Sequence, residues 1–190
     1  DLAAGYASLG SVDRELGNHA RALTHYQLAA GIRKKLMAAY PQRVQYRRGM
    51  AIVQNKLGNL HRKAGRIDQA ILAYEESRRL RELILKTEAA PNARLDLATT
   101  CYNLGVAWRQ NGDTARAIAL ISRGISTLEV GYSTSSATAQ RKQTLGFLLR
   151  ERAMNHTQHR NYAAAVCDWR SAMKFLGPAD VEHAELELLW

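Results

Sequence analysis

Two histidines have the spacing of a possible metal site. His156 and His159 lie three residues apart in a stretch that we expect to be helical, so both rings could face one metal ion. No third ligand follows nearby, and the sequence has neither an HExxH motif nor two closely spaced cysteines. We therefore expect both histidines to pack or to be solvated at a helix end, and we expect neither a metal nor a cofactor.

Phosphate-transfer chemistry has no support in the sequence. Neither the GxxxxGK[ST] loop nor the GxGxxG loop occurs. His61 and Arg62 are followed by Lys63, whereas the catalytic loop of a protein kinase needs an aspartate at that place. We therefore predict that this segment is not an enzyme and has no small-molecule substrate.

The charge balance favours acidic partners, because the formal net charge is +10 over 190 residues. Three basic runs, at 32–36, 46–49 and 77–83, carry much of the excess. We expect most of these side chains to be solvated on outer helix faces. Nucleic-acid binding is the less favoured alternative, since glutamates interrupt the runs and no aromatic stacking platform accompanies them.

Cysteine usage and hydropathy predict a cytoplasmic chain without membrane contact. Cys101 and Cys167 lie far apart in apolar contexts, which predicts two buried, reduced thiols and no disulfide. No apolar run is long enough to span a membrane, and no signal peptide opens the sequence.

A repeat with a step of 47 or 48 residues organises the chain. A Leu-Gly pair recurs, with its glycine at Gly10, Gly58 and Gly105. Each copy continues with a second glycine, an alanine, a large residue and a small residue at constant offsets; the second glycines are Gly17, Gly65 and Gly112, and the large residues are Tyr26, Tyr74 and Ile121. A degenerate fourth copy has Ala153, Arg160, Ala165, Trp169 and Ala172 at these positions.

This pattern predicts two helices joined by a tight turn in each copy. A glycine inside a helix lowers helix propensity, but it lets a neighbouring helix approach closely. A glycine just past a helix end suits the left-handed conformation found there. Asn18, Asp113 and Asn161 follow this turn and are expected to cap the next helix.

We expect helices over 2–16, 20–39, 44–64, 67–87, 93–111, 115–131, 137–158 and 163–175. The copies then span about 1–40, 42–90, 92–132 and 137–177, with a flexible joint at 132–136. Residues 178–190 are expected to start a further or capping helix. The chain begins with a helical pattern and ends in the apolar Leu188, Leu189 and Trp190, which predicts a segment of a larger protein.

The repeat resembles the tetratricopeptide repeat (TPR) family, on its Leu-Gly, later alanine and large residue. The family unit has about 34 residues, so the longer step here indicates helices of roughly 30 Å. The resemblance implies an all-α, right-handed superhelical α-solenoid that forms a single array of TPR-like repeats with extended helices.

In TPR arrays the first helix of each unit lines a concave groove that holds an extended partner. Counting from each Leu-Gly pair, the resemblance implies a groove formed by Arg14, Asn55, Asn59, Arg62, Lys63, Tyr102, Asn103, Arg109 and Arg150. Asparagine amides can bond to a peptide backbone, and arginines can bind carboxylates. A resemblance to peptide-binding members, including kinesin light chains, supports the asparagines. The carboxylate clamp of chaperone-binding members is not matched, because Ala7 and Ser11 stand where a lysine and an asparagine are needed.

We therefore expect a protein–protein interaction scaffold that binds an acidic peptide or a partner helix in its groove. The alternative is a regulatory or sensor segment of a bacterial serine/threonine kinase, because long-step arrays with "YNLG", "YRRGMA" and "GRIDQA" resemble those that follow such kinase domains. Binding of nucleic acid by the basic faces is a minor alternative.

Overall fold

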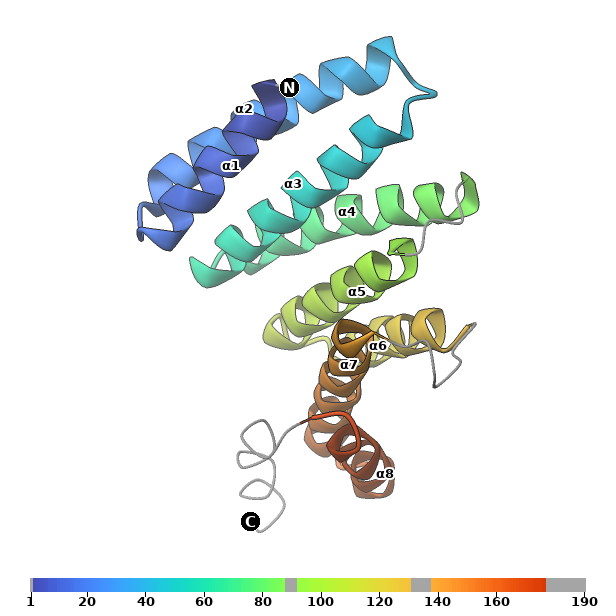
Figure 1. Cartoon of the computed structure of the whole chain (residues 1–190). Helices are drawn as coiled ribbons and strands as arrows, with labels where there is room; N and C mark the ends of the chain where they lie inside the picture. The colour runs from blue at the N-terminus through green and yellow to red at the C-terminus, as the bar shows by residue number, and fades with distance from the viewer. Residues whose placement is uncertain (1, 88–91, 131–137, 177–190) are drawn as a thin grey trace. The chain divides into compact units, whose positions relative to one another are not determined.

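All regular structure in residues 2–87, 92–130 and 138–176, the residues that the computed structural model describes, is helical. The chain divides into two compact units, Asp1–Ala93 and Arg94–Trp190. The first unit contains α1 (Leu2–Glu15), α2 (His19–Ala39), α3 (Val44–Lys63) and α4 (Ile67–Thr87). The second contains α5 (Ala93–Gln110), α6 (Thr114–Glu129), α7 (Ala139–Gln158) and α8 (Tyr162–Met173) (Figure 1). The prediction of an all-α chain is confirmed.

The helix ends lie within two residues of the predicted ones. Two predicted features fall outside the described residues: the joint at 132–136 and the further helix in 178–190. Whether the repeats form a single array stays a prediction, because the two units are described separately.

A close contact between a glycine and a large side chain joins the two helices of each complete copy. A Cβ atom added to Gly58 would lie 2.5 Å from the Tyr74 ring, and one added to Gly105 would lie 2.6 Å from Ile121. Gly10 has the same relation to Tyr26, at 2.7 Å. The glycines therefore permit a helix approach that any larger residue would prevent, as the repeat predicts.

The turn between the paired helices has the same backbone form in all four copies. Gly17, Gly65 and Gly112 have φ angles of 79°, 72° and 87°. The residue after each turn glycine donates its N–H to a carbonyl five residues earlier, as in Arg66 N to His61 O at 2.9 Å. This is the Schellman ending of a helix. Arg160 adopts it without a glycine, at φ 58°, and Asn161 N still reaches His156 O at 2.8 Å.

Two of the three predicted helix caps are present. Asp113 accepts a hydrogen bond from Arg116 N, and Asn161 accepts one from Ala164 N. The prediction for Asn18 is wrong, because its side chain makes no cap hydrogen bond. Its amide instead donates to the carboxylate of Asp13 at 3.5 Å. Asp13 is buried, so its carboxylate needs donors more than the solvated helix end does.

Cysteine placement differs in part from the prediction. Cys101 is buried, and its Cβ lies 3.1 Å from the position of a Cβ on Gly124. Cys167 is exposed, so the prediction that it is buried is wrong. It lies on α8 between Val166 and the buried Asp168, and its own side chain points outward from the helix.

The basic runs are only partly solvated. Arg33 on α2 and Arg81 on α4 are each 8% exposed and occupy equivalent positions, 48 residues apart. Arg78 pairs with Glu75 and Glu82 along α4, and Arg79 pairs with Glu76. The remaining positive charge of these runs is on exposed residues such as Lys34 and Lys35.

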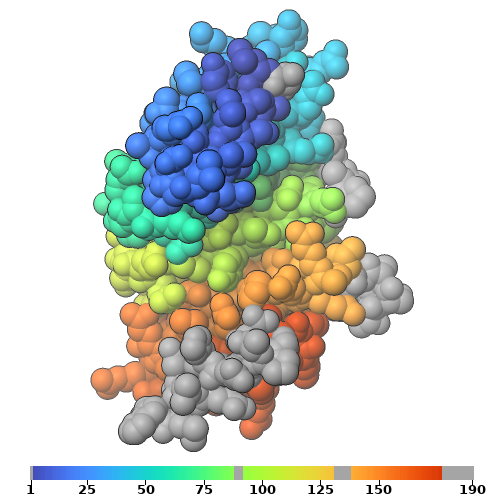
Figure 2. Space-filling view, turned by 60° about the vertical axis from the view of Figure 1, so that its left-hand side comes forward, coloured from blue at the N-terminus to red at the C-terminus, as the bar shows by residue number. Residues whose placement is uncertain are grey.

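The outer face of α1 carries exposed apolar side chains: Leu2, Leu9, Val12 and Leu16. Figure 2 shows α1, in dark blue, and α2, in lighter blue, at the surface of the first unit. The equivalents of the first three on α3 are Met50, Leu57 and Leu60, which are buried, and the last two pack with α2 side chains such as Tyr26. None of the described helices is long and apolar enough to cross a membrane.

The close contact between a glycine and a large side chain predicts opposite effects on stability when two different glycines are replaced by alanine. Gly58→Ala should destabilise the chain by about 1–3 kcal/mol, because the buried Tyr74 ring must move. Gly31→Ala on α2 should stabilise it by about 1 kcal/mol or less, because its Cβ meets nothing within 4 Å. Urea denaturation of both variants measures the difference. Equal stabilities would show that Gly58 is not at a close helix contact.

The left-handed turn of the fourth copy predicts a stabilising change. Arg160→Gly should raise the free energy of unfolding by about 1 kcal/mol, because glycine adopts a φ of 58° without a Cβ penalty. Thermal unfolding should show a higher midpoint for this variant and a lower one for Gly112→Ala, the reverse change at the equivalent turn. A destabilised Arg160→Gly variant would mean that the arginine side chain stabilises the fold through contacts.

Candidate functional site

The predicted groove residues are divided between the two units. Arg14 lies on α1, and Asn55, Asn59, Arg62 and Lys63 lie on α3 in the first unit. In the second unit, α5 carries Tyr102, Asn103 and Arg109, and α7 carries Arg150. Each unit therefore has its own set on its odd-numbered helices.

In the first unit, the α3 residues are partly engaged by the fold. The Tyr74 hydroxyl donates to Oδ1 of Asn59 at 2.7 Å. Arg62 lies beside the same hydroxyl, and burial raises the pKa of Tyr74 against the opposing effect of this cation. Asn59 therefore has its amide nitrogen left for a partner, while Lys63 is exposed at the helix end.

The sequence analysis missed Lys56, which lies next to Asn55 on α3. Its ammonium group donates to the Ser11 hydroxyl at 2.5 Å and lies 5.8 Å from the centre of the Tyr26 ring. Burial lowers the pKa of Lys56, the nearby Arg14 lowers it further, and Glu15 acts in the opposite direction. The only signal in the sequence is its position in the repeat, two residues before Gly58. The residues at this position in the other copies are Ser8, Asn103 and Glu151.

Lys56 lies in a crevice between α1 and α3 with a volume of about 240 Å³. One wall is Ala4, Ala7 and Ser8 of α1, and the other is Gly49, Ile52, Val53 and Lys56 of α3. Arg33 of α2 completes the lining. The crevice thus combines small and aliphatic walls with two basic side chains.

In the second unit, the main basic residue on α5 is already paired. Arg109 Nε donates to Oε1 of Glu151 on α7 at 2.5 Å, and Glu151 is 3% exposed. The backbone carbonyl of Glu151 also accepts from the Asn155 amide at 2.7 Å. The positive charge of Arg109 is therefore neutralised within the fold, although the sequence analysis expected it to face a partner.

Two of the other predicted residues of this unit, Tyr102 and Arg150, make aromatic contacts. The Tyr102 and Phe147 rings lie 6.3 Å apart. The Arg150 guanidinium lies 5.2 Å from the centre of the Phe147 ring, in cation–π geometry. The structure thus brings Tyr102 and Arg150 together around Phe147.

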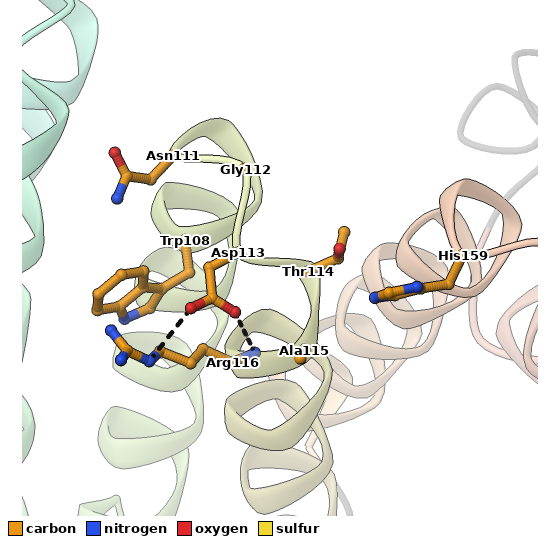
Figure 3. A pocket seen from close by; sticks show the side chains of 8 residues that line it. All are labelled: Trp108, Asn111, Gly112, Asp113, Thr114, Ala115, Arg116 and His159. Atoms are coloured by element: carbon orange, nitrogen blue, oxygen red, sulfur yellow. Dashed lines mark hydrogen bonds and ion pairs between the residues drawn. The ribbon is translucent and has the colours of Figure 1, made fainter.

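A pocket of about 560 Å³ lies at the turn between α5 and α6 (Figure 3). Arg116 stacks 4.5 Å from the centre of the Trp108 ring, and its guanidinium pairs with Asp113 at 3.2 Å. Figure 3 shows His159, after α7, on the opposite side of the pocket. Because Asp113 already caps α6, a bound anion would gain little from that helix end. None of the predicted groove residues lines this pocket.

The histidine pair of the sequence analysis does not face one site. His156 Nε2 lies 3.9 Å from a carboxylate oxygen of Asp168, whereas His159 lines the pocket at the α5–α6 turn. Burial lowers the pKa of His156, with Asp168 opposing this shift. Among the described residues, no group of three metal-binding side chains comes together.

The two units differ strongly in charge. Asp1–Ala93 has 16 basic and 8 acidic residues, a formal charge of +8. Arg94–Trp190 has 11 basic and 9 acidic residues, a formal charge of +2. The first unit therefore carries most of the positive charge that could attract an acidic partner.

Neither a protein-family model nor a curated protein matches this chain. Among solved structures, the crystal structure of BtubC (BKLC) from P. vanneervenii is similar, with a TM-score of 0.73 and 16% sequence identity. The similarity covers 92% of this chain and 63% of BtubC, so this chain spans less than two thirds of that protein. At this identity, the similarity concerns the fold alone.

The Arg109–Glu151 pair predicts a structural cost for losing Arg109. Arg109→Ala should destabilise the chain by about 1–3 kcal/mol, because it leaves a buried carboxylate without its cation. Adding Glu151→Gln should recover part of this loss, since the uncompensated charge is removed. Arg79→Ala is the control, because its exposed pair with Glu76 should contribute about 0.5 kcal/mol or less. Denaturant unfolding of the four proteins would contradict the account if Arg109→Ala and Arg79→Ala cost the same.

Proposed function

We propose that the chain is a TPR-type interaction scaffold that binds an extended acidic segment of another protein. In this proposal the four helix pairs form one right-handed superhelical array, and the odd-numbered helices face its groove. The common Schellman turns, the repeated glycine contact and the similarity to BtubC support this arrangement.

One observation carries the functional proposal: the first unit combines a high positive charge with a helix that has a polar face. That unit has a formal charge of +8, and its helix α3 presents Asn55, Lys56, Asn59 and Arg62 in succession. Amide side chains at such spacing can bond to the backbone of an extended segment. Nearby ammonium and guanidinium groups favour carboxylates on that segment and speed its association.

The proposal assigns no catalytic step to this segment and places it in the cytoplasm. Its two cysteines, Cys101 and Cys167, are not joined in a disulfide, which suits a reducing compartment. Nucleic acid is a weaker candidate partner, because two arginines of the basic run at 77–83, Arg78 and Arg79, are paired with glutamates on the same helix.

The test uses three labelled, proline-spaced peptides that differ only in carrying glutamate, glutamine or lysine at the same positions. Fluorescence anisotropy with the full chain should show binding of the glutamate peptide, weaker binding of the glutamine peptide and none of the lysine peptide. Affinity for the glutamate peptide should fall as salt rises, because its charge contribution is screened.

A single-stranded DNA of similar length is the comparison ligand. Equal affinity for the glutamate and glutamine peptides would contradict the proposal. Tighter binding of the DNA than of the glutamate peptide at the same salt concentration would favour the nucleic-acid alternative.

A further inference from the structure

The crevice between α1 and α3 has a basic group at each end. Gly49 and Lys56 lie seven residues apart on α3, which is about 10 Å along the helix. The Arg33 guanidinium packs at the Gly49 end, where a Cβ on Gly49 would lie 2.7 Å from it. Lys56 stands at the other end. The crevice is therefore about as long as a few residues of extended peptide.

The lining contains no acidic side chain to balance the charge of Lys56. Its other members are Ala4, Ala7, Ser8, Gly49, Ile52 and Val53. Glu15 raises the pKa of Lys56, and its carboxylate forms an ion pair with Arg14 at 3.2 Å. Ser11, the hydrogen-bond partner of Lys56, is uncharged and takes one of the three ammonium donors. Donors on Lys56 therefore remain for an anion.

The position equivalent to Lys56 in the second unit holds a charged residue whose charge is neutralised within the fold. Glu151 of α7 is the equivalent of Lys56, and it is buried and paired with Arg109. The second unit thus supplies both charges of its pair. The first unit supplies only the cation, beside an open crevice.

We propose that the crevice between α1 and α3 binds the carboxylate of an aspartate or glutamate side chain, with Lys56 as its donor and the aliphatic wall covering the side chain's methylene groups. This inference rests on the proposed function and names the part of the partner that the first unit recognises. Arg33 lines the far end of the crevice.

The walls favour a carboxylate on an aliphatic side chain over a phosphate. Ile52 is 40% exposed and Val53 is 2% exposed, so Val53 forms the floor and Ile52 the rim. A glutamate side chain can bury its methylenes against such a wall. Inorganic phosphate has no such group and would leave the apolar surface uncovered.

The test observes Lys56 directly in the full chain, by NMR of protein labelled with ¹³C at the lysine ε-carbons. The probes are N-acetylglutamate N-methylamide, its neutral glutamine analogue, and inorganic phosphate. The glutamate probe should shift the Lys56 signal saturably. The glutamine analogue and phosphate should shift it far less, and the exposed Lys34 should not respond specifically to any probe.

Two variants test separately how the charge of Lys56 and the width of the crevice affect peptide affinity. Lys56→Gln should weaken binding of the glutamate-rich peptide about tenfold, as expected for loss of a hydrogen bond between charged groups. Ala4→Leu should weaken it by narrowing the crevice at an exposed position, without a change of charge. Lys34→Gln, which removes an exposed lysine on α2, is the matched control and should leave the affinity unchanged.

The inference is overturned if the glutamate probe gives no saturable shift of Lys56, or if phosphate or the glutamine analogue shifts it equally. This result is independent of whether the glutamate-rich peptide binds. If that peptide binds while the Lys56 signal stays unmoved by the probe, the crevice assignment fails and the proposed function stands. If the Lys56 signal responds but the peptide does not bind, the crevice stands and the proposed groove fails.

Discussion

The close approach of paired helices at a glycine positions the polar groups of α3. Tyr74 can lie against α3 only because Gly58 has no side chain, and this contact brings its hydroxyl to Asn59. Tyr26 packs on Gly10 in the same way and lies beneath the ammonium of Lys56. The glycine contact thus positions the polar face of α3 as well as the core of the first unit.

The two units have the same helix arrangement in each repeat but differ in how the charges on their odd-numbered helices are paired. In the second unit the odd-numbered helices pair a cation with a buried acid, and this pair links α5 to α7. In the first unit the same register gives Lys56 an uncharged serine and an aromatic ring as neighbours. In the proposed function, the carboxylate of a bound partner pairs with this cation.

Local patterns were predictable from the sequence, whereas pairings between distant residues were not. The glycine offsets predicted eight helices and the left-handed turns because those constraints act within a few residues. Asn18 was predicted as a cap and failed because a buried Asp13 on the preceding helix takes its amide. Arg109 was predicted to bind a partner protein, because nothing near it in the sequence identifies Glu151, 42 residues away, as the acid with which it forms an ion pair. Lys56 was missed because its neighbours Ser11 and Tyr26 come from two other helices.

The central claim is that acidic segments bind along α1 and α3 of the first unit. A nitroxide label on the glutamate-rich peptide would test it most directly, through paramagnetic broadening of NMR signals across the whole chain. The account predicts loss of intensity at Ser8, Lys56 and Asn59, with signals of α2 such as that of Lys34 retained. Broadening centred on the exposed lysines of α2, or confined to the second unit, would contradict it.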